Sequence, residues 1–171
     1  EDDEVRLLYV GRFTQDKGLD VLIGAFLKAA SEDPRLRLSL IGPQESSEGG
    51  DSNFFISMRA AVSAHPSGDK IRFERPIYEM EKLRARVFEA DLFCLPARDG
   101  ETLNMSALEA AACGLPMLVS SAGGNPELVP DTECESILPA GDIAAWAEGI
   151  KRAAARGTTG LAAAGGAFLE H

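Results

Sequence analysis

The sequence predicts an α/β fold: a Rossmann-like, doubly wound parallel sheet of about six strands with helices on both faces. Short apolar runs alternate along the chain with segments of helical periodicity, which is the pattern of parallel βα units. The runs are continuously apolar, as strands buried on both faces require. The length of 171 residues, of which 45% are hydrophobic and 26% charged, suits a single domain.

Each expected element follows from local pattern. Six apolar runs are expected to form the strands: 6–10, 36–41, 70–73, 91–95, 117–120 and 135–138. Five segments with helical spacing are expected to form helices: 19–30, 54–65, 78–90, 104–113 and 142–155. Gly114 and Pro116 stop the fourth helix. The Gly- and Ser-rich stretch 44–52 is expected to be a surface loop, and the glycine-rich tail after residue 156 predicts no defined element.

Charge and composition exclude several classes of partner. The net charge of -10 argues against a bare nucleic-acid or anionic-membrane partner. No apolar run approaches the ~18 residues of a membrane span.

The acidic start is unlike the basic start of a signal peptide, and we expect the chain to be cut from a longer protein. Residues 169–171 are expected to be a tag remnant. Three cysteines without C-x-x-C spacing indicate reduced thiols in a cytoplasmic protein.

The segment 11–18, Gly-Arg-Phe-Thr-Gln-Asp-Lys-Gly, follows the first expected strand and opens the first helix. Glycine lets the backbone turn tightly and lets a ligand approach closely. Arg12 and Lys17 place two cations beside a helix N-terminus, whose free N–H groups already favour anions. A diphosphate is the ligand that this arrangement suits best. The spacing matches neither a dinucleotide fingerprint nor a P-loop. Taken alone, the segment also fits an ordinary solvated loop.

The segment 98–109 follows the expected strand 91–95 and leads into a helix whose first N–H groups face the same sheet edge. Glu101 lies in the loop before that helix, and Glu109 lies more than a turn inside it. Carboxylates suit hydroxyl-rich ligands because each oxygen accepts charge-assisted hydrogen bonds. The alternatives are a helix-start carboxylate for Glu101 and a surface residue for Glu109. The apolar neighbours of Glu109 leave it little polar face, which favours a specific partner.

A third segment, Gly-Gly-Asn-Pro-Glu at 123–127, follows the expected strand 117–120. Glycines let its backbone approach a ligand, while Pro126 and Glu127 suit the first turn of a helix. On physical grounds this segment predicts a strand-to-helix turn.

Together, the three segments resemble the C-terminal domain of family 4 retaining glycosyltransferases, which have the GT-B fold. The resemblance runs over about residues 7–150. It is carried by an opening motif at 9–12 with 17–18, the E-x7-E pair Glu101 and Glu109, and the stretches 109–116 and 123–127. One of these motifs would be weak, whereas the set is specific.

The resemblance implies a nucleotide sugar as donor substrate. Arg12 and Lys17 would hold the diphosphate and stabilise the leaving group. Glu101 would contact the donor sugar at the reacting face, and these three are the expected catalytic residues. The expected donor-binding residues are Gly11, Arg12, Lys17, Glu101, Thr102, Leu103, Asn104, Met105 and Glu109, with Glu109 on the ribose. The base is expected against Pro76, Ile77 and Tyr78.

The resemblance also implies a domain organisation. Residues 1–168 would form one nucleotide-sugar-binding domain, the C-terminal half of a two-domain enzyme, with the N-terminal acceptor domain as its partner. The reaction would transfer a hexosyl-type sugar with retention and without an obligatory metal or cofactor. We expect a cytoplasmic protein, with association of the full-length protein at the membrane surface left open. Neither nucleic acid nor a membrane contact is expected for this chain.

The sequence departs from the family at 102–106, where Thr-Leu-Asn-Met-Ser replaces the usual Phe-Gly-Leu-Pro stretch, and at 131–138, where an expected glycine loop is missing. The first departure leaves the donor sugar open. It also keeps a non-catalytic nucleotide-sugar-binding or regulatory module as the alternative. An epimerase, a glycan phosphorylase, a dinucleotide-dependent oxidoreductase and an interaction-only domain fit the motifs less well.

Overall fold

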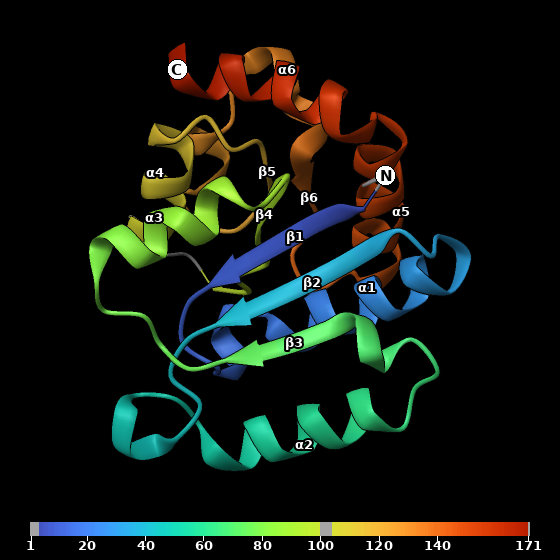
Figure 1. The fold of residues 1–171 in the computed structure, drawn as a ribbon, viewed down its shortest axis with the longest axis vertical. Helices are drawn as coiled ribbons and strands as arrows, with labels where there is room; N and C mark the ends of the chain where they lie inside the picture. Colours follow the sequence, from blue (N-terminus) through green and yellow to red (C-terminus); the bar gives the residue numbers. More distant parts are fainter. Residues whose placement is uncertain (1–3, 100–103, 171) are drawn as a thin grey trace.

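The computed structural model describes residues 4–99 and 104–170 of the chain. It contains a six-stranded parallel sheet with the order β3-β2-β1-β4-β5-β6 (Figure 1). The strands are β1 Val5–Val10, β2 Leu36–Ile41, β3 Ile71–Glu74, β4 Leu92–Leu95, β5 Met117–Ser120 and β6 Ile137–Leu138. The predicted doubly wound fold is confirmed, and the strand order reverses between β1 and β4.

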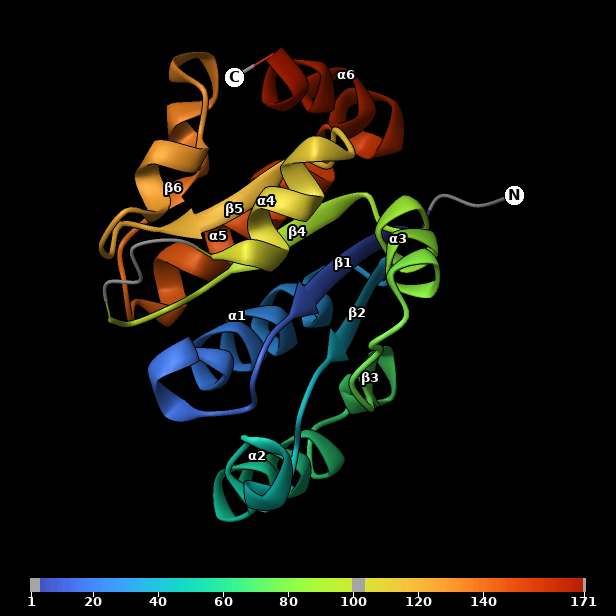
Figure 2. The same ribbon diagram turned by 90° about the vertical axis from the view of Figure 1, so that its left-hand side faces the viewer.

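Helices cover both faces of the sheet, and Figure 2 shows α1 and α3 on opposite sides of it. The α-helices are α1 Leu19–Glu32, α2 Ser52–Ser63, α3 Met80–Phe88, α4 Met105–Ala112, α5 Ile143–Ala155 and α6 Gly157–Glu170. Short 3-10 helices form η1 Gln15–Lys17, η2 Ser46–Glu48, η3 Gly68–Lys70, η4 Asn125–Leu128 and η5 Asp131–Ser136. No helix among the described residues is long and apolar enough to cross a membrane.

The alternation of side chains along β1 divides the core in two. Leu7 and Tyr9 belong to one buried cluster with side chains of α1 and α5. Leu8 faces the other side and packs in a second cluster with side chains of α3 and α4. Because successive side chains of a strand point to opposite faces, one apolar run supplies both cores.

The glycine-rich tail, for which the sequence predicted no element, forms helix α6. Its buried side chains Leu161, Ala164 and Phe168 give it an apolar stripe. A Cβ atom on Gly165 would lie 1.9 Å from the carbonyl oxygen of Gly114, just after α4. Glycine at this position therefore allows α6 to pack closely on the end of α4.

Candidate functional site

A hollow of about 350 Å³ lies where β1 and β4 end side by side. Its lining comes from three segments that are distant in sequence: 9–12 with Lys17, the residues Leu95 and Ala97, and 104–106 with Glu109. The hollow thus lies at the carboxyl ends of the strands where the strand order reverses, which is the usual ligand position in open α/β sheets.

Tyr9 orders the loop that follows β1. Its side chain is 2% exposed, and its hydroxyl donates a hydrogen bond of 2.8 Å to the carbonyl oxygen of Arg12. Burial raises the pKa of Tyr9 above its ordinary value, so the hydroxyl keeps its proton and remains a donor. A Cβ atom on Gly11 would lie 2.8 Å from this hydroxyl, so glycine leaves room for the ring to reach past it.

Phe13 anchors the same loop in the core. Its fully buried ring lies 5.9–6.2 Å, between ring centroids, from Tyr9, Phe55 and Phe73. The N–H group of Phe13 donates to the carbonyl oxygen of Pro43 at 3.0 Å. This anchoring holds the backbone of the preceding Arg12 at the hollow, while the Arg12 side chain remains 55% exposed.

Lys17 reaches the hollow because Gly18 allows a close approach. Gly18 has a φ of 69°, and a Cβ atom on it would lie 1.9 Å from the carbonyl oxygen of Pro96, which follows β4. Only glycine fits both the left-handed backbone and this contact. The Lys17 side chain is consequently 12% exposed and lines the hollow beside the end of β4.

Asp16 lies beside both cations of this loop. Its carboxylate is 3.8 Å from the Arg12 guanidinium and 3.6 Å from the Lys17 ammonium. Partial burial raises the pKa of Asp16, but hydrogen bonding and the charges of Lys17 and Arg12 outweigh it and hold the pKa below its usual value. The carboxylate is therefore ionised at neutral pH.

The N-terminus of α4 forms the opposite wall. Asn104 caps the helix, and its side-chain oxygen accepts a hydrogen bond of 3.0 Å from the N–H group of Ala107. The Ser106 hydroxyl lies 2.8 Å from both that side-chain oxygen and the carbonyl oxygen of Val10. Having one proton, it donates to one of them at a time. The bond to Val10 fixes the start of α4 against the end of β1, so the helix dipole faces the hollow.

Glu109 extends the polar lining one turn further along α4. Its side chain is half-buried and borders the hollow. Within residues 4–99 and 104–170, its carboxylate makes no hydrogen bond or ion pair. Polar groups that lose water usually have a partner, so a carboxylate in this position suits a hydroxyl-bearing ligand.

The structure brings together six of the predicted site residues and leaves others elsewhere. Lining the hollow are Gly11, Arg12, Lys17, Asn104, Met105 and Glu109. Glu101, Thr102 and Leu103 lie outside the described residues. Pro76, Ile77 and Tyr78 follow β3 and do not line this hollow: Ile77 packs on the core side of α3 and α4, and Tyr78 is 80% exposed. Their predicted role at the base stays a prediction.

Sequence reasoning did not single out Tyr9, Asp16 or Ser106 as functional. The signal for Ser106 is its position two residues after a helix-capping Asn104. For Asp16 the signal is its place next to Lys17, four residues after Arg12, where a carboxylate can reach both cations. The segment 123–127 forms the predicted strand-to-helix turn as η4. Its Asn125 is buried and donates to Ser120, away from the hollow.

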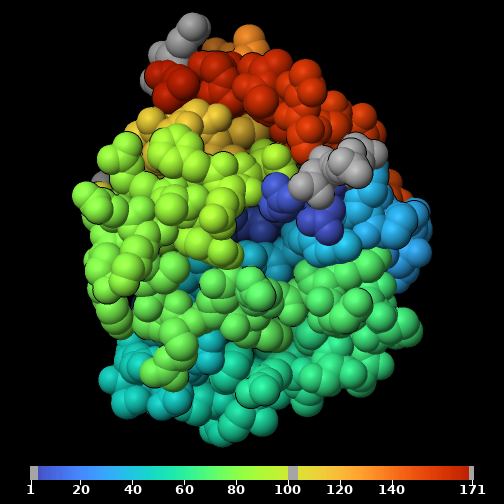
Figure 3. All heavy atoms as spheres, viewed as in Figure 1, coloured from blue at the N-terminus to red at the C-terminus, as the bar shows by residue number. Residues whose placement is uncertain are grey.

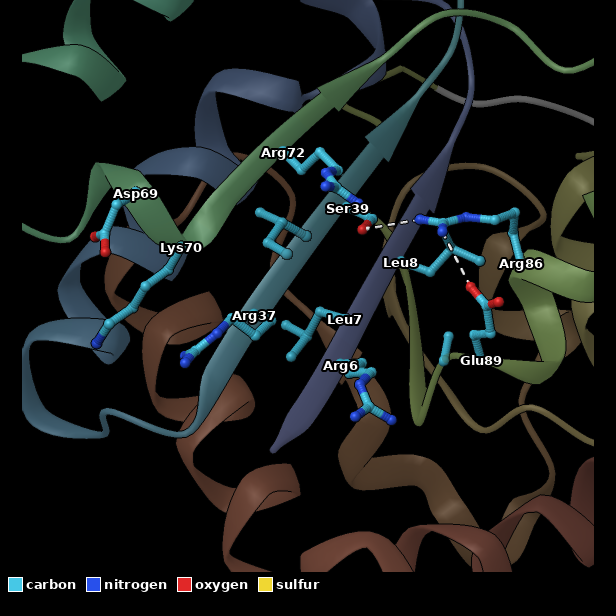
Figure 4. Close-up of a pocket in the computed structure, with 12 residues that line it drawn as sticks. Arg6, Leu7, Leu8, Arg37, Ser39, Asp69, Lys70, Arg72, Arg86 and Glu89 are labelled. Atoms are coloured by element: carbon cyan, nitrogen blue, oxygen red, sulfur yellow. Dashed lines mark hydrogen bonds and ion pairs between the residues drawn. The ribbon is translucent and has the colours of Figure 1, made fainter. Parts of the chain in front are cut away.

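A second hollow, of about 410 Å³, lies over the first halves of β1 and β2 beside α3 (Figures 3 and 4). Arg86 in its wall pairs with Glu74 at 2.6 Å and with Glu89 at 3.0 Å, and Arg37 pairs with Glu4 at 3.0 Å. These cations already have counter-ions. The hollow also lies at the opposite ends of the strands from the reversal point, so the smaller hollow is the candidate functional site.

Comparison with known proteins shows the family of the chain. A family model described as glycosyl transferases group 1 matches residues 1–159. The chain is 30% identical over 159 residues to a D-inositol 3-phosphate glycosyltransferase of Geodermatophilus obscurus, covering 91% of the chain and 34% of that protein. It is 29% identical over 171 residues to a GDP-mannose-dependent alpha-(1-6)-phosphatidylinositol monomannoside mannosyltransferase of Mycolicibacterium smegmatis, covering 92% of the chain and 42% of that protein.

Among solved structures, the fold is similar to a sucrose-phosphate synthase from Thermosynechococcus elongatus. The TM-score is 0.83 at 28% identity, over 99% of this chain and 41% of that one. The chain thus spans between a third and about two-fifths of the length of the curated relatives described. Because the family model covers nearly the whole sequence, the chain belongs to the group 1 glycosyl transferase family.

Proposed function

We propose that this chain is the donor-binding domain of a retaining glycosyltransferase, which transfers a hexosyl-type sugar from a nucleoside-diphosphate sugar to an acceptor hydroxyl. The observation that carries the proposal is the convergence of Arg12, Lys17, the N-terminus of α4 and Glu109 on one hollow at the reversal point of the sheet. Two cations and a helix dipole suit a diphosphate, and a carboxylate one turn further suits sugar or ribose hydroxyls.

In this proposal, Arg12 and Lys17 bind the diphosphate and stabilise the negative charge that grows on it as the sugar departs. Such fixed cations act most strongly where little water remains, which describes the mostly buried Lys17. The start of α4 adds free N–H groups on the other side of the diphosphate. The anionic leaving group is thereby stabilised from two directions by groups that need not reorganise.

The remaining contacts continue along the donor: Gly11 and Met105 shape the diphosphate pocket, and Glu109 accepts hydrogen bonds from the ribose hydroxyls. Glu101, with Thr102 and Leu103, contacts the donor sugar. The base lies against the loop of Pro76, Ile77 and Tyr78, whose exposed aromatic ring offers a stacking surface.

The rest of the enzyme is also part of the proposal. The acceptor site would lie on an N-terminal domain, consistent with a chain that spans a minority of the length of its relatives. A nucleotide-sugar donor agrees with the name of the mycobacterial relative, which is GDP-mannose-dependent. Free thiols at Cys94, Cys113 and Cys134 favour a cytoplasmic location.

The first experiment is calorimetric titration of the chain with UDP, GDP and ADP. We expect saturable binding of one nucleoside diphosphate. Arg12→Ala or Lys17→Ala should weaken it about 10- to 100-fold, because each removes a charge-assisted hydrogen bond. Arg72→Ala is the matched control, since Arg72 is exposed in the second hollow. Unchanged affinity in both site variants would refute the diphosphate assignment.

We further propose that no metal ion or other cofactor is obligatory, because Arg12 and Lys17 supply the positive charge that a divalent cation would otherwise bring to the diphosphate. Binding of the nucleoside diphosphate should then be the same in the presence of excess chelator and of added Mg²⁺. A large loss of affinity on chelation would contradict this part of the proposal and leave the donor-binding role standing.

A further inference from the structure

We propose that Asp16 makes this site discriminate between the nucleotide sugar, which is the donor, and the free nucleoside diphosphate, which is the product. Its carboxylate repels the free nucleoside diphosphate more strongly than the sugar conjugate, and so favours product release. The inference rests on the proposed donor-binding function and assigns a role in that site to a residue outside its lining. The Asp16 carboxylate lies 3.8 Å from the Arg12 guanidinium and 3.6 Å from the Lys17 ammonium, so it competes with a bound phosphate for these two cations.

Geometry limits how far a bound phosphate can lie from this carboxylate. The Asp16 carboxylate is 3.6 Å from the Lys17 ammonium nitrogen. A phosphate oxygen bound to the same nitrogen would be about 2.8 Å from it. The two negatively charged oxygens therefore lie no more than about 6.5 Å apart, which is within the Debye length of ~8 Å at physiological salt. Their repulsion is consequently only partly screened.

The repulsion depends on how much charge the ligand carries. A free nucleoside diphosphate has about one more negative charge at neutral pH than its sugar conjugate, because its terminal phosphate ionises a second time near about pH 6. At the dielectric constant of water, repulsion between unit charges about 6.5 Å apart corresponds to about a threefold change in binding. The carboxylate therefore penalises the product by about threefold more than the donor.

Two features keep the carboxylate in this place and in its charged form. The backbone carbonyl oxygen of Asp16 accepts a hydrogen bond of 2.8 Å from the N–H group of Arg98, which ties η1 to the loop after β4. Partial burial raises the pKa of Asp16, but hydrogen bonding with Thr14 and the charges of Lys17 and Arg12 outweigh it and hold the pKa below its usual value. Without ligand, the carboxylate also relieves the repulsion between Arg12 and Lys17.

The test compares the unsubstituted chain with Asp16→Asn, which keeps the size and removes the charge. Dissociation constants are measured by calorimetry for the nucleoside diphosphate that binds and for its glucose or mannose conjugate. We expect both ligands to bind more tightly to the variant and the ratio of the two constants to shift by about threefold toward the free diphosphate. The shift should disappear at about 1 M salt, where the Debye length is ~3 Å.

Two further variants separate charge from structure. Asp69→Asn removes the same charge from an exposed residue at the far end of β3 and should leave both constants unchanged. Asp16→Glu keeps the charge and should keep the ratio of the two dissociation constants. If circular dichroism shows that Asp16→Asn does not fold, Asp16→Ser is used in its place. An unchanged ratio in the uncharged variant, or equal weakening of both ligands, would mean that Asp16 only holds the loop. If neither ligand binds the unsubstituted chain, the proposed function fails and this inference with it.

Discussion

At the residue scale, the hydroxyl of Tyr9 is the contact that most directly shapes the first loop of the site. It is buried under the loop and donates to the backbone of Arg12, which carries one of the two cations. The Tyr9 ring lies within β1 and packs in the core, as a phenylalanine ring could, whereas its hydroxyl reaches the loop. The hydroxyl therefore stabilises the loop rather than the core.

Tyr9→Phe tests this single bond. Removing the donor leaves a partly buried carbonyl oxygen with one partner fewer, so we expect a loss of about 1 to 2 kcal/mol in the free energy of unfolding. Affinity for the nucleoside diphosphate should also fall several-fold. Chemical denaturation and calorimetry measure the two effects. Tyr78→Phe, which removes an exposed hydroxyl, is the stability control. Equal stability of Tyr9→Phe and the unsubstituted chain would contradict the assignment.

Asp33 gives a residue-scale prediction about pH. Hydrogen bonds from Arg35, at 2.7 and 3.0 Å, hold the pKa of Asp33 below its usual value. A lowered folded-state pKa stabilises the fold above the unfolded value of about 3.9, and that contribution is lost as pH falls through the folded-state value. Asp33→Asn should thus lower the free energy of unfolding by about 1 kcal/mol at pH 7, after allowance for solvent screening.

The difference in free energy of unfolding between the unsubstituted chain and Asp33→Asn should shrink as pH falls from about 4 through the lowered folded-state pKa, below which both carry a neutral side chain. Denaturation at several pH values measures it. Asp69→Asn removes an exposed carboxylate instead and should change stability little at any pH. A constant difference between pH 7 and pH 3 would show that the Asp33 side chain acts through its shape.

At the element scale, the sequence predicts the helices whose signals are local and misses the one whose signal is not. Helix α4 begins after a capping Asn104 and ends before Gly114, so both ends are visible in sequence. Helix α6 contains three glycines after its first residue, at 160, 165 and 166, each of which lowers intrinsic helix propensity. Its stability comes from packing of Leu161 and Phe168 in the two core clusters and of Gly165 on the end of α4, which are contacts with residues distant in sequence.

Neighbouring glycines in α6 allow a matched experiment. A side chain at Gly165 would collide with the carbonyl oxygen of Gly114, whereas one at Gly166 would meet nothing within 4 Å. Gly165→Val should lower the free energy of unfolding by about 1 to 3 kcal/mol through overpacking. Gly166→Ala should raise it by up to about 1 kcal/mol through helix propensity. Thermal denaturation measures both, and equal effects of one sign would contradict close packing of α6 on α4.

At the scale of the whole molecule, the sequence pattern predicts the layered fold and the edge where the site lies, because parallel strands end at a common edge. It also places Arg12, Lys17 and Glu109 at that edge. The pattern cannot show the counter-ion arrangement around Asp16 or the bond from Tyr9, since these depend on side-chain distances of a few ångströms. Nor can it place the loop of Pro76 to Tyr78 relative to the hollow, because that depends on how α3 packs on the sheet.

The site joins the ends of β1 and β4 with the start of α4, so a ligand in it should stabilise the whole sheet. At a concentration of 100 times its dissociation constant, a nucleoside diphosphate that binds only the folded chain adds about 2.7 kcal/mol to the free energy of unfolding. For a domain of this size, that corresponds to a rise in Tm of about 5 to 10 °C, measurable by scanning calorimetry. Lys17→Ala should lose about half of this rise or more at the same ligand concentration, whereas Arg72→Ala should keep it. A rise of equal size in Lys17→Ala would place the ligand elsewhere, because the mostly buried ammonium of Lys17 is central to the proposed diphosphate contact.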